Sequence, residues 1–397
     1  MVFWRWIFTA STWLLGLGWA WQALDRWLHR QDVSFLSQLS MTPMDEVDGP
    51  HLTVVVPACN EQDAIEATLR GLLASQGLRL QILAVNDRST DATGARMEAI
   101  ATEYCGSACG HTLEVLHIRE LPPGWLGKPH ALALAARRAQ ATWILFTDGD
   151  VEFAPEALAR ALAFAQREEA DHLAVLPDWV VTSRAERAMQ GAMFAMTGWG
   201  LRYWKIADPK ARDFLGVGAF NLMRTSSYEA VGGFEALRME VLEDLRIGWR
   251  VKQAGLRQRF AWGQGMVRVR WANGAWGVVR NLEKNVFALF RYRLLVALGA
   301  CAGVALHIAL PLLALAAGGW ARGAGVLSFF ALAAVYAVQQ KRIRVPVWYV
   351  IFFPFALTLF LFAMARSITM TLVRGGVVWR GTLYPIRALR AAAGNRW

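Results

Sequence analysis

The sequence is poor in charged residues and in cysteine. Of its 397 residues only 18% are charged, four are cysteines and 13 are prolines. Soluble globular domains carry about 25% charged residues, so we expect part of this chain to lie in lipid. Four cysteines and no low-complexity tract exclude a disulfide-rich scaffold, a collagen-like chain and a disordered chain.

The abundant residues indicate a large, basic membrane protein. Apolar residues make up 55% of the chain, which holds 19 Trp and 20 Phe, and the formal net charge is +11. A chain of this length fits two or three domains. The positive charge suits anionic lipid, a phosphate-rich substrate or nucleic acid. Because much of it flanks apolar segments, we do not expect nucleic acid as a partner.

Four charge-free stretches are long enough to cross a bilayer core, which takes about 17–25 helical residues. Trp residues cluster near the ends of the first stretch, as amphipathic rings do in the headgroup layer. Its apolar part is longer than that of a secretory signal and no small-residue cleavage site follows, so we expect an uncleaved anchor. The four stretches are Ile7–Leu24, Leu294–Ala321, Gly323–Gln340 and Val345–Ala365.

Basic residues beside these stretches predict their orientation. Arg26 and Arg30 follow the first stretch, and a basic run at 341–344 lies between the last two. Positive residues stay on the cytoplasmic side, which predicts a multi-pass protein of the cell (inner) membrane with a cytoplasmic middle segment. Four full crossings would place the arginine-rich end of the chain outside. Either Val345–Ala365 does not fully cross, or another segment bends back.

The segment between the membrane stretches has the pattern of an α/β domain. Short apolar runs alternate with helical spacing, which predicts a parallel sheet with helices on both faces. We expect strands at His51–Val56, Leu80–Val85, Leu113–Ile118 and Trp143–Thr147, and helices from Gln62, up to Tyr104 and over Lys128–Gln140. The chain is expected to divide into an N-terminal anchor (1–30), this domain (50–265), an amphipathic interfacial segment (266–293), a transmembrane cluster (294–374) and a basic tail (375–397).

Acidic side chains follow three of the expected strands, at the edge where ligands bind such sheets. Glu61 follows the first strand, Asp87 the second, and Asp148 and Asp150 the fourth. Carboxylates gathered in one crevice repel one another unless a cation lies between them. Mg²⁺ or Mn²⁺ is the simple solution, because hard cations take one or two carboxylates together with substrate phosphates. An Asp-Gly-Asp turn alone is common on surfaces; its place after a buried strand is what favours a metal site.

Six motifs occur along the chain in a characteristic order. They are VVVPACNE (54–61), AVNDRSTD (84–91), GWLGKPHAL (124–132), LFTDGDVEF (145–153), GAFNLMRTSSYEAVGGFE (218–235) and LEDLRIGWRVKQAG (242–255). Their order and spacing resemble the inverting family-2 glycosyltransferases, whose α/β domain has the Rossmann-like GT-A fold. The closest resemblance is to a membrane-attached subgroup that includes hopanoid-associated and carotenoid glycosyltransferases. In that subgroup an N-terminal anchor and a C-terminal membrane cluster flank the catalytic domain.

The resemblance implies where the donor binds. Pro57, Asn60 and Glu61 would line the nucleotide pocket. Asp87 would accept a hydrogen bond from the base, as its counterpart does with uracil, so the implied donor is a UDP-sugar. Asp148 would hold the ribose side of the same nucleotide.

The resemblance also implies how the reaction proceeds. Asp150 would ligate the metal that bridges the diphosphate, and Asp244, in the pair with Glu243, would take the proton of the attacking hydroxyl. The metal would stabilise the leaving diphosphate. Lys128 and Lys284 would add positive contacts to the diphosphate. Plainer interpretations of these lysines stay open, namely a helix-start lysine and an exposed lysine beside the membrane.

Two departures from the family pattern bear on the acceptor. The usual Asp-Asp pair after the second strand is Asn86-Asp87 here, which keeps the second carboxylate. Processive polysaccharide synthases carry Gln/Arg-x-x-Arg-Trp, but Val267 stands at the first position of the nearest candidate. Three C-terminal stretches are also few for a polysaccharide channel. We therefore expect single transfer onto the hydroxyl of a membrane lipid, such as a hopanoid, a carotenoid or a glycolipid-like acceptor.

Two other functions stay open at this point. One is transfer onto a polyprenyl phosphate, an acceptor that is already an anion and needs no base. The other is a non-catalytic membrane binding component with the same fold. The intact acidic residues argue against the second.

A zinc site is set aside. Cys105 and Cys109, with His111 and His117, have the residue types of a zinc cage. The adjoining strand and short loop leave little room for tetrahedral ligation.

Overall fold

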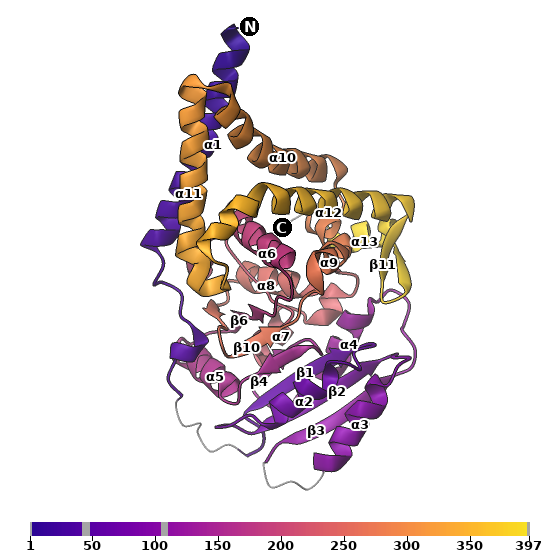
Figure 1. The fold of residues 1–397 in the computed structure, drawn as a ribbon. Helices are drawn as coiled ribbons and strands as arrows, with labels where there is room; N and C mark the ends of the chain where they lie inside the picture. The colour runs from indigo at the N-terminus through magenta and orange to yellow at the C-terminus, as the bar shows by residue number, and fades with distance from the viewer. Residues whose placement is uncertain (1, 42–47, 105–109, 395–397) are drawn as a thin grey trace. The chain divides into compact units, whose positions relative to one another are not determined.

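The computed structural model describes residues 2–41, 48–104 and 110–394, and it divides into two compact units. The helical unit comprises Met1–Asp32, Val181–Arg202 and Trp271–Trp379. The sheet unit comprises Val33–Val180, Tyr203–Arg270 and Arg380–Trp397. Each unit is thus assembled from segments that lie far apart in the sequence (Figure 1).

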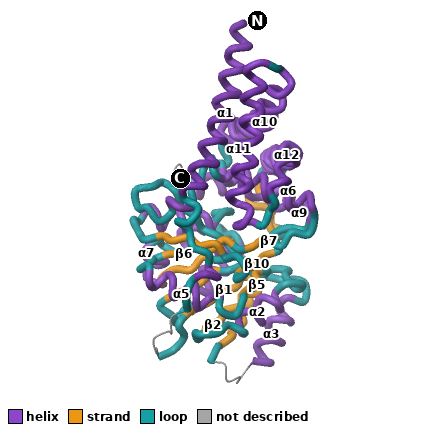
Figure 2. Tube along the Cα trace, turned by 60° about the vertical axis from the view of Figure 1, so that its left-hand side comes forward, coloured by secondary structure: helices purple, strands orange, loops and turns teal. Residues whose placement is uncertain are grey.

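The sheet unit is built on a seven-stranded sheet with the order β3-β2-β1-β4-β8-β6-β9. The strands are drawn in orange in Figure 2. A second, three-stranded sheet has the order β5-β10-β7. The strands are β1 (Leu52–Ala58), β2 (Leu80–Asp87), β3 (Thr112–Ile118), β4 (Trp143–Phe146), β5 (Val151–Phe153), β6 (His172–Leu176), β7 (Asp178–Trp179), β8 (Asn221–Arg224), β9 (Gln258–Trp262), β10 (Val267–Val269) and β12 (Thr382–Pro385).

Helices connect these strands. They are α2 (Ile65–Leu73), α3 (Thr93–Tyr104), α4 (Gly127–Ala136), α5 (Ala157–Arg167), α7 (Thr225–Ala230), α8 (Glu243–Gln253) and α13 (Ile386–Ala393), with short 3₁₀ turns η1 (Leu36–Gln38), η2 (Tyr203–Lys205) and η3 (Phe234–Leu237). β1 is buried along its whole length, as expected of a central strand covered on both faces. One face of the seven-stranded sheet packs against α4, α7, η3 and α8 in a continuous apolar core. α2 and α3 pack against each other, and α3 contacts β2 and β3.

The predicted α/β fold is confirmed, with one difference in strand direction. β1, β2, β3 and β4 run parallel, as the alternation of strands and helices predicts. β8 runs antiparallel to both of its neighbours, β4 and β6. The sheet is therefore mixed rather than purely parallel.

The four predicted strands lie close to their expected positions, but one predicted helix is too long. α4 ends at Ala136 and not at Gln140. The reason is that the chain there is already bound to the sheet. The backbone N–H of Gln140 donates to Gln81 Oε1 at 2.9 Å, and that of Ala141 donates to Thr53 Oγ1 at 3.2 Å.

The helical unit consists almost wholly of helices. They are α1 (Val2–Leu28), α6 (Arg184–Thr197), α9 (Gly274–Leu289), α10 (Leu294–Ala317), α11 (Gly319–Ile343), the 3₁₀ turn η4 (Val347–Phe352) and α12 (Phe353–Val373), followed by the short strand β11 (Gly376–Trp379). α1 packs along α11, and Arg26 donates a hydrogen bond to Gln339 Oε1 at 2.8 Å between them. α12 packs along α9.

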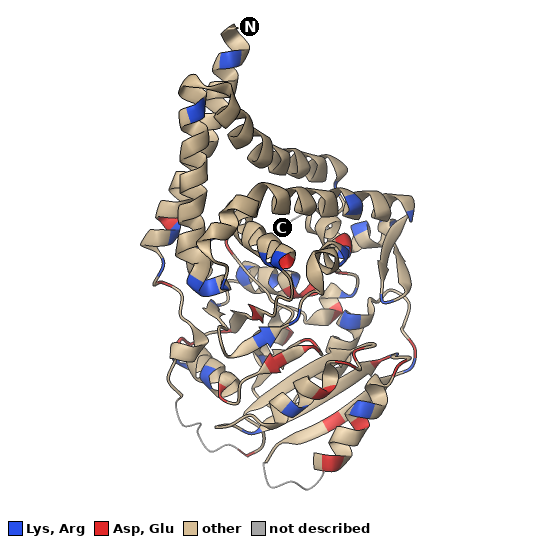
Figure 3. Cartoon of the chain, viewed as in Figure 1, with Lys and Arg blue, Asp and Glu red and all other residues tan. Residues whose placement is uncertain are grey.

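Three helices of this unit are long and apolar enough to cross a membrane, judged by length and composition. They are Leu294–Ala317, Gly319–Ile343 and Val347–Val373, where the sequence predicts three membrane stretches. Few charged residues lie along them, as the colouring by residue type in Figure 3 shows. α1 is a 27-residue helix with several exposed Trp side chains, and its role as an anchor stays a prediction.

The end of the chain folds with the sheet unit. Tyr384 and Leu389 are buried at 6% and 0% exposure. The segment that the sequence predicts as a basic tail therefore contributes a strand and a helix to the unit that holds the large sheet.

Candidate functional site

The carboxyl ends of three neighbouring strands carry the predicted site residues. Glu61 follows β1, Asp87 ends β2, and Asp148 and Asp150 follow β4. Because β1 pairs in parallel with both β2 and β4, the three ends share one edge of the sheet.

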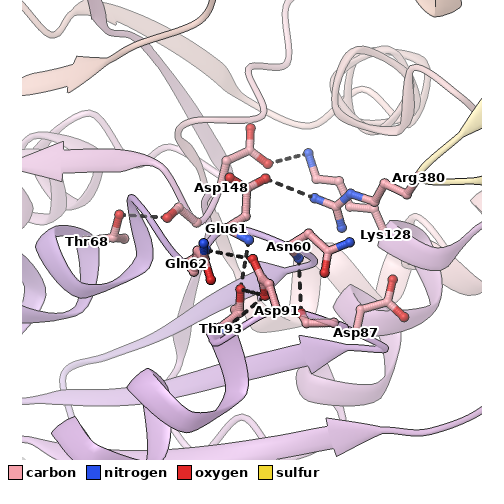
Figure 4. A network of polar contacts seen from close by, with 12 residues as sticks. Asn60, Glu61, Gln62, Thr68, Asp87, Asp91, Thr93, Lys128, Asp148 and Arg380 are labelled. Carbon is pink, nitrogen blue, oxygen red and sulfur yellow. Dashed lines mark hydrogen bonds and ion pairs between the residues drawn. The ribbon is translucent and has the colours of Figure 1, made fainter.

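The loop after β1 is bound to the loop after β2 (Figure 4). The backbone N–H of Asn60 donates to Ser89 Oγ at 3.1 Å, and Thr90 N donates to Asn60 Oδ1 at 2.8 Å. Glu61 N donates to Thr93 Oγ1 at 2.8 Å. Asn60 has a left-handed backbone with φ 58, a conformation that non-glycine residues adopt rarely and often at functional sites. The predicted pocket residue Asn60 thus shapes this edge through its loop contacts, and Pro57 is buried within β1.

Asp87 is completely buried and paired with the residue that follows it. Arg88 donates to both carboxylate oxygens, at 2.7 Å and 3.1 Å. The start of α4 packs directly against this pair, since a Cβ at Gly127 would lie 2.5 Å from Asp87 Oδ2. Only glycine fits there. The predicted hydrogen bond from a nucleotide base to the Asp87 carboxylate stays a prediction.

Lys128, next along α4, joins two carboxylates from distant parts of the sequence. Its Nζ lies 2.6 Å from Asp148 Oδ1 and 2.7 Å from Glu243 Oε1. Burial alone would lower the pKa of Lys128, but the negative charges of Asp148, Glu243 and Asp244 outweigh it and raise the pKa above its usual value. The lysine is therefore a permanent cation between acidic side chains.

Asp244 lies in the first turn of α8 with both carboxylate oxygens held. Gly218 N donates to Oδ2 at 2.8 Å, and Leu245 N donates to Oδ1 at 2.7 Å. Gly218 is also close to the opposite side of the cluster, since a Cβ there would lie 2.8 Å from Asp148 Oδ2 and 3.2 Å from Lys128 Nζ. Asp148, Lys128, Glu243 and Asp244 therefore meet around Gly218, and a small cavity lies against them.

The turn that carries Asp148 and Asp150 is held close to β1. Thr68 Oγ1 donates to the Gly149 carbonyl at 3.0 Å, and a Cβ at Gly149 would lie 3.1 Å from Ala58 Cβ. Burial raises the pKa of Asp150, and the negative charges of Asp148 and Glu61 raise it further, to about 7.

This crowding of carboxylates fits a divalent cation. Lys128 balances part of this negative charge, and the raised pKa of Asp150 shows that acidic charge remains, which suits Mg²⁺ or Mn²⁺. Among the residues that the structure describes, no set of three or more His, Cys, Asp or Glu side chains is arranged to hold a metal alone. Asp150, the predicted metal ligand, is the residue of this edge whose carboxylate would hold such an ion.

The comparison with known families assigns these residues to one domain. The family model described as Glycosyl transferase family 2 matches residues 53–245, which include every site residue named so far except Lys284. This protein contains a glycosyltransferase family 2 domain. The prediction of that family and of an enzyme with this activity is confirmed.

One solved structure shows a similar fold. The mannosyltransferase PcManGT from Pyrobaculum calidifontis, in complex with GDP-Man and Mn²⁺, matches with a TM-score of 0.51 at 18% identity, over 91% of this chain and 97% of that one. TarS from S. aureus matches with a TM-score of 0.38 at 16% identity, over 74% of this chain and 44% of that one. S. aureus TarS 1–349 in complex with UDP-GlcNAc gives 0.39 at 14% identity, over 82% and 92%. The two lower scores support no conclusion about this chain. No curated protein matches the sequence significantly.

Lys284 lies in the helical unit of this glycosyltransferase. It is on α9, and its Nζ lies 4.2 Å from the centre of the Trp379 ring in a cation–π contact. It lines a cavity of about 270 Å³ together with Arg280 and Arg374. A contact between Lys284 and a diphosphate stays a prediction.

Four site residues of the glycosyltransferase were not predicted as such. Arg88 and Gly127 enclose Asp87, and Gly218 orders the carboxylates around it. All three lie inside the six motifs, Arg88 in AVNDRSTD, Gly127 in GWLGKPHAL and Gly218 in GAFNLMRTSSYEAVGGFE, which was the available signal. Arg380, whose guanidinium lies 3.8 Å from Glu61 Oε1, comes from the tail and had no such signal.

The two histidines of the rejected zinc site have other partners. His111 Nδ1 accepts from Leu80 N at 3.1 Å, and His117 Nε2 lies 2.8 Å from Glu98 Oε1. Cys105 and Cys109 lie outside the described residues.

Proposed function

We propose that this glycosyltransferase moves a sugar, with inversion, from a nucleotide-diphosphate sugar to the hydroxyl of a membrane lipid. The observation that carries the proposal is the meeting of Asp148, Lys128, Glu243 and Asp244 around Gly218 at the sheet edge. This arrangement places the hydrogen-bonded Asp244 carboxylate beside a cluster of side chains suited to a cation and the phosphates of the sugar donor.

Asp244 is suited to act as the general base. Each of its oxygens accepts one backbone hydrogen bond and keeps a second lone pair. The acceptor oxygen attacks the anomeric carbon while its proton passes to the Asp244 carboxylate. The bond from that carbon to the diphosphate oxygen breaks on the opposite face, and a nucleoside diphosphate leaves.

Asp150 would hold the divalent cation, Mg²⁺ or Mn²⁺, and Asp148 would hold the ribose side of the nucleotide. When bound, such an ion stabilises the negative charge that develops on the leaving diphosphate. Lys128 balances the charges of Asp148 and Glu243, which keeps the two acidic side chains together without the substrate. Asn60 and Glu61 would line the nucleotide side of the same edge, with a UDP-sugar as the expected donor.

The acceptor is proposed to be a hopanoid, a carotenoid or a glycolipid-like alcohol. Support comes from the resemblance to the membrane-attached subgroup and from the three apolar helices beside the domain in sequence. A lipid hydroxyl has to lose a proton as it attacks, so this acceptor needs a base.

Replacing Asp244 tests the proposal. In detergent-purified Asp244→Asn protein with Mn²⁺ and total lipid extract, we expect transfer from UDP- and GDP-sugars to fall by at least 100-fold, because the base is gone. Mass spectrometry of the lipids measures it. Undiminished transfer would refute a base at Asp244. Loss in Asp150→Asn with survival in Asp244→Asn would favour a polyprenyl-phosphate acceptor instead.

We also propose a membrane arrangement, in which the whole sheet unit lies on one side of the bilayer. The chain leaves that unit after Arg270 and returns at Arg380, so in this proposal both points lie on that side. The number of full crossings between them is then even, although three candidate spans lie there. We assign α10 and α11 as the crossing pair, joined at Gly318.

α12 is assigned to the membrane interface. It packs along α9, and Arg366 within it donates to Glu283 Oε2 at 2.7 Å. An ion pair of this kind suits the headgroup layer better than the hydrocarbon core. The basic run at 341–344 and the arginines of the last segment then share the cytoplasmic side of the cell membrane with the sheet unit.

Single cysteines in a cysteine-free background test this arrangement. We expect residues 63 and 387 to react with a membrane-impermeant maleimide from the same side, and residue 320 from the other. Inside-out and right-side-out vesicles distinguish the sides. Labelling of 387 together with 320 would contradict the even number of crossings.

A further inference from the structure

Arg380, near the C-terminus, lies close to Glu61 at the sheet edge where β1, β2 and β4 end. It lies far outside the segment that matches the family model, which ends at residue 245. It is nevertheless part of the sheet unit, in which Tyr384 and Leu389 anchor the same segment by burial. Its position is therefore fixed by the fold of that unit.

The backbone turns sharply to present this side chain. Arg380 has φ 49 and the next residue, Gly381, has φ 78, both in the left-handed region. A left-handed arginine costs conformational energy of about 1 kcal/mol or more. In Figure 4 its side chain points toward Glu61.

The guanidinium has unused hydrogen-bonding capacity. Nη2 lies 3.8 Å from Glu61 Oε1, which is too long for a hydrogen bond. Nη1 is buried, and within the described residues it has no hydrogen-bond partner. Overall the side chain is 21% exposed. A buried charged donor without an acceptor is unfavourable, so this geometry is suited to a ligand that supplies one.

The surroundings of Arg380 place it among the residues at the strand ends. Cys59 lies between β1 and Asn60, and burial raises the pKa of its thiol. The positive charge of Arg380 is the strongest influence that opposes this rise, and Arg88 opposes it more weakly, whereas the negative charges of Asp87 and Glu61 raise the pKa further. The guanidinium therefore acts on the loops that line the nucleotide side of the edge.

We propose that Arg380 binds a phosphate of the donor's diphosphate, an inference that rests on the proposed function. A planar guanidinium matches the oxygens of a phosphate with two parallel hydrogen bonds. The other two cations nearby are already engaged, Arg88 by Asp87 and Lys128 by Asp148 and Glu243. In the part of the chain that the structure describes, Arg380 has a single distant ion-pair partner, Glu61, and its guanidinium is available to an anion.

The proposal is tested by nucleotide binding rather than by turnover alone. Isothermal titration calorimetry of the full chain in detergent, with Mn²⁺, measures the affinity for each ligand. The first ligand set is UDP, UMP and uridine, and the second is GDP, GMP and guanosine. For Arg380→Gln we expect affinity for the diphosphate to fall 10- to 100-fold, and affinity for the nucleoside to change less than threefold. Arg380→Lys should be intermediate, because it keeps the charge but not the planar fork. The same titration with EDTA should keep the difference between the variants.

Arg387→Gln is the matched control. It removes an exposed arginine from the same segment, and it should leave all affinities unchanged. Equal losses for the diphosphate, the monophosphate and the nucleoside in Arg380→Gln, with lower thermal stability, would show a purely structural role and overturn the inference. Wild-type binding of diphosphate with no loss in Arg380→Gln would overturn it while leaving the proposed function intact. Failure of every nucleotide to bind the wild type would overturn both.

Discussion

The Lys128 ammonium on α4 lies 2.7 Å from Glu243 Oε1 on α8. The side chains of both residues are almost fully buried, at 11% and 4% exposure. This ion pair connects the part of the domain that carries the strand ends with the part that carries Asp244. A buried carboxylate is tolerated here because the lysine charge offsets the cost of burial.

Removing the lysine is expected to destabilise the domain. Lys128→Met leaves Asp148 and Glu243 without their cation, and loss of one partner of a buried pair costs about 3–5 kcal/mol. Denaturant unfolding in detergent, followed by Trp fluorescence, measures this change. The exposed Lys210→Met should change the unfolding free energy by less than about 0.5 kcal/mol. Equal stability of Lys128→Met and the wild type would refute a structural ion pair.

Gly218 is expected to be required for activity more than for folding. An added Cβ in Gly218→Ala would lie 2.8 Å from Asp148 Oδ2, so the carboxylates must move apart. We expect sugar transfer to fall by at least 10-fold with a cooperative unfolding transition retained. Gly200→Ala, where nothing lies within 4 Å of the new atom, is the control. Full activity in Gly218→Ala would mean that the spacing around Gly218 is unimportant.

Asp150 is expected to determine metal affinity. Asp150→Asn removes a carboxylate oxygen donor, so Mn²⁺ affinity measured by electron paramagnetic resonance in the presence of a nucleoside diphosphate should fall by at least 10-fold. The exposed Asp63→Asn should bind Mn²⁺ as the wild type does. Unchanged affinity in Asp150→Asn would exclude this residue as a ligand.

His172 predicts a pH dependence of stability. Burial lowers its pKa to about 4 from a reference of 6.5, with the bond to Asn221 opposing the shift. Between these values the unfolded chain binds a proton that the folded chain does not. The unfolding free energy should therefore fall as pH drops from 6.5 toward 4, by up to about 3 kcal/mol from this group.

His172 is connected to the candidate site through Asn221. Asn221 Oδ1 accepts from His172 Nε2 at 3.0 Å and from Val217 N at 3.2 Å, next to Gly218. Unfolding measured from pH 7.5 to 4.5 should show a shallower fall for His172→Gln than for the wild type, whereas the exposed His117→Gln should follow the wild type. Identical profiles for all three would contradict a buried neutral histidine.

The sequence predicts the sheet edge well because local patterns determine it. β1, β2 and β4 are buried apolar runs that end in acidic residues, and parallel strands bring those ends together without further information. Asp148 and Lys128 belong to motifs whose position in the fold follows from strand order. Their contact is a direct consequence of that arrangement.

Other features depend on long-range packing that no local pattern records. The antiparallel direction of β8 follows from how the chain returns between β4 and β6. Arg380 looks like one of many basic residues after a membrane stretch. Its approach to Glu61 depends on the last segment folding back onto the sheet unit, which charge patterns alone do not predict.

The most direct test of the central claim is an experimental structure of the full chain with Mn²⁺ and a nucleoside diphosphate sugar. The account predicts the diphosphate at the edge formed by Asp148 and Asp150, with the anomeric carbon facing the Asp244 carboxylate. A nucleotide bound elsewhere, or Asp244 on a different surface from the sugar, would contradict it.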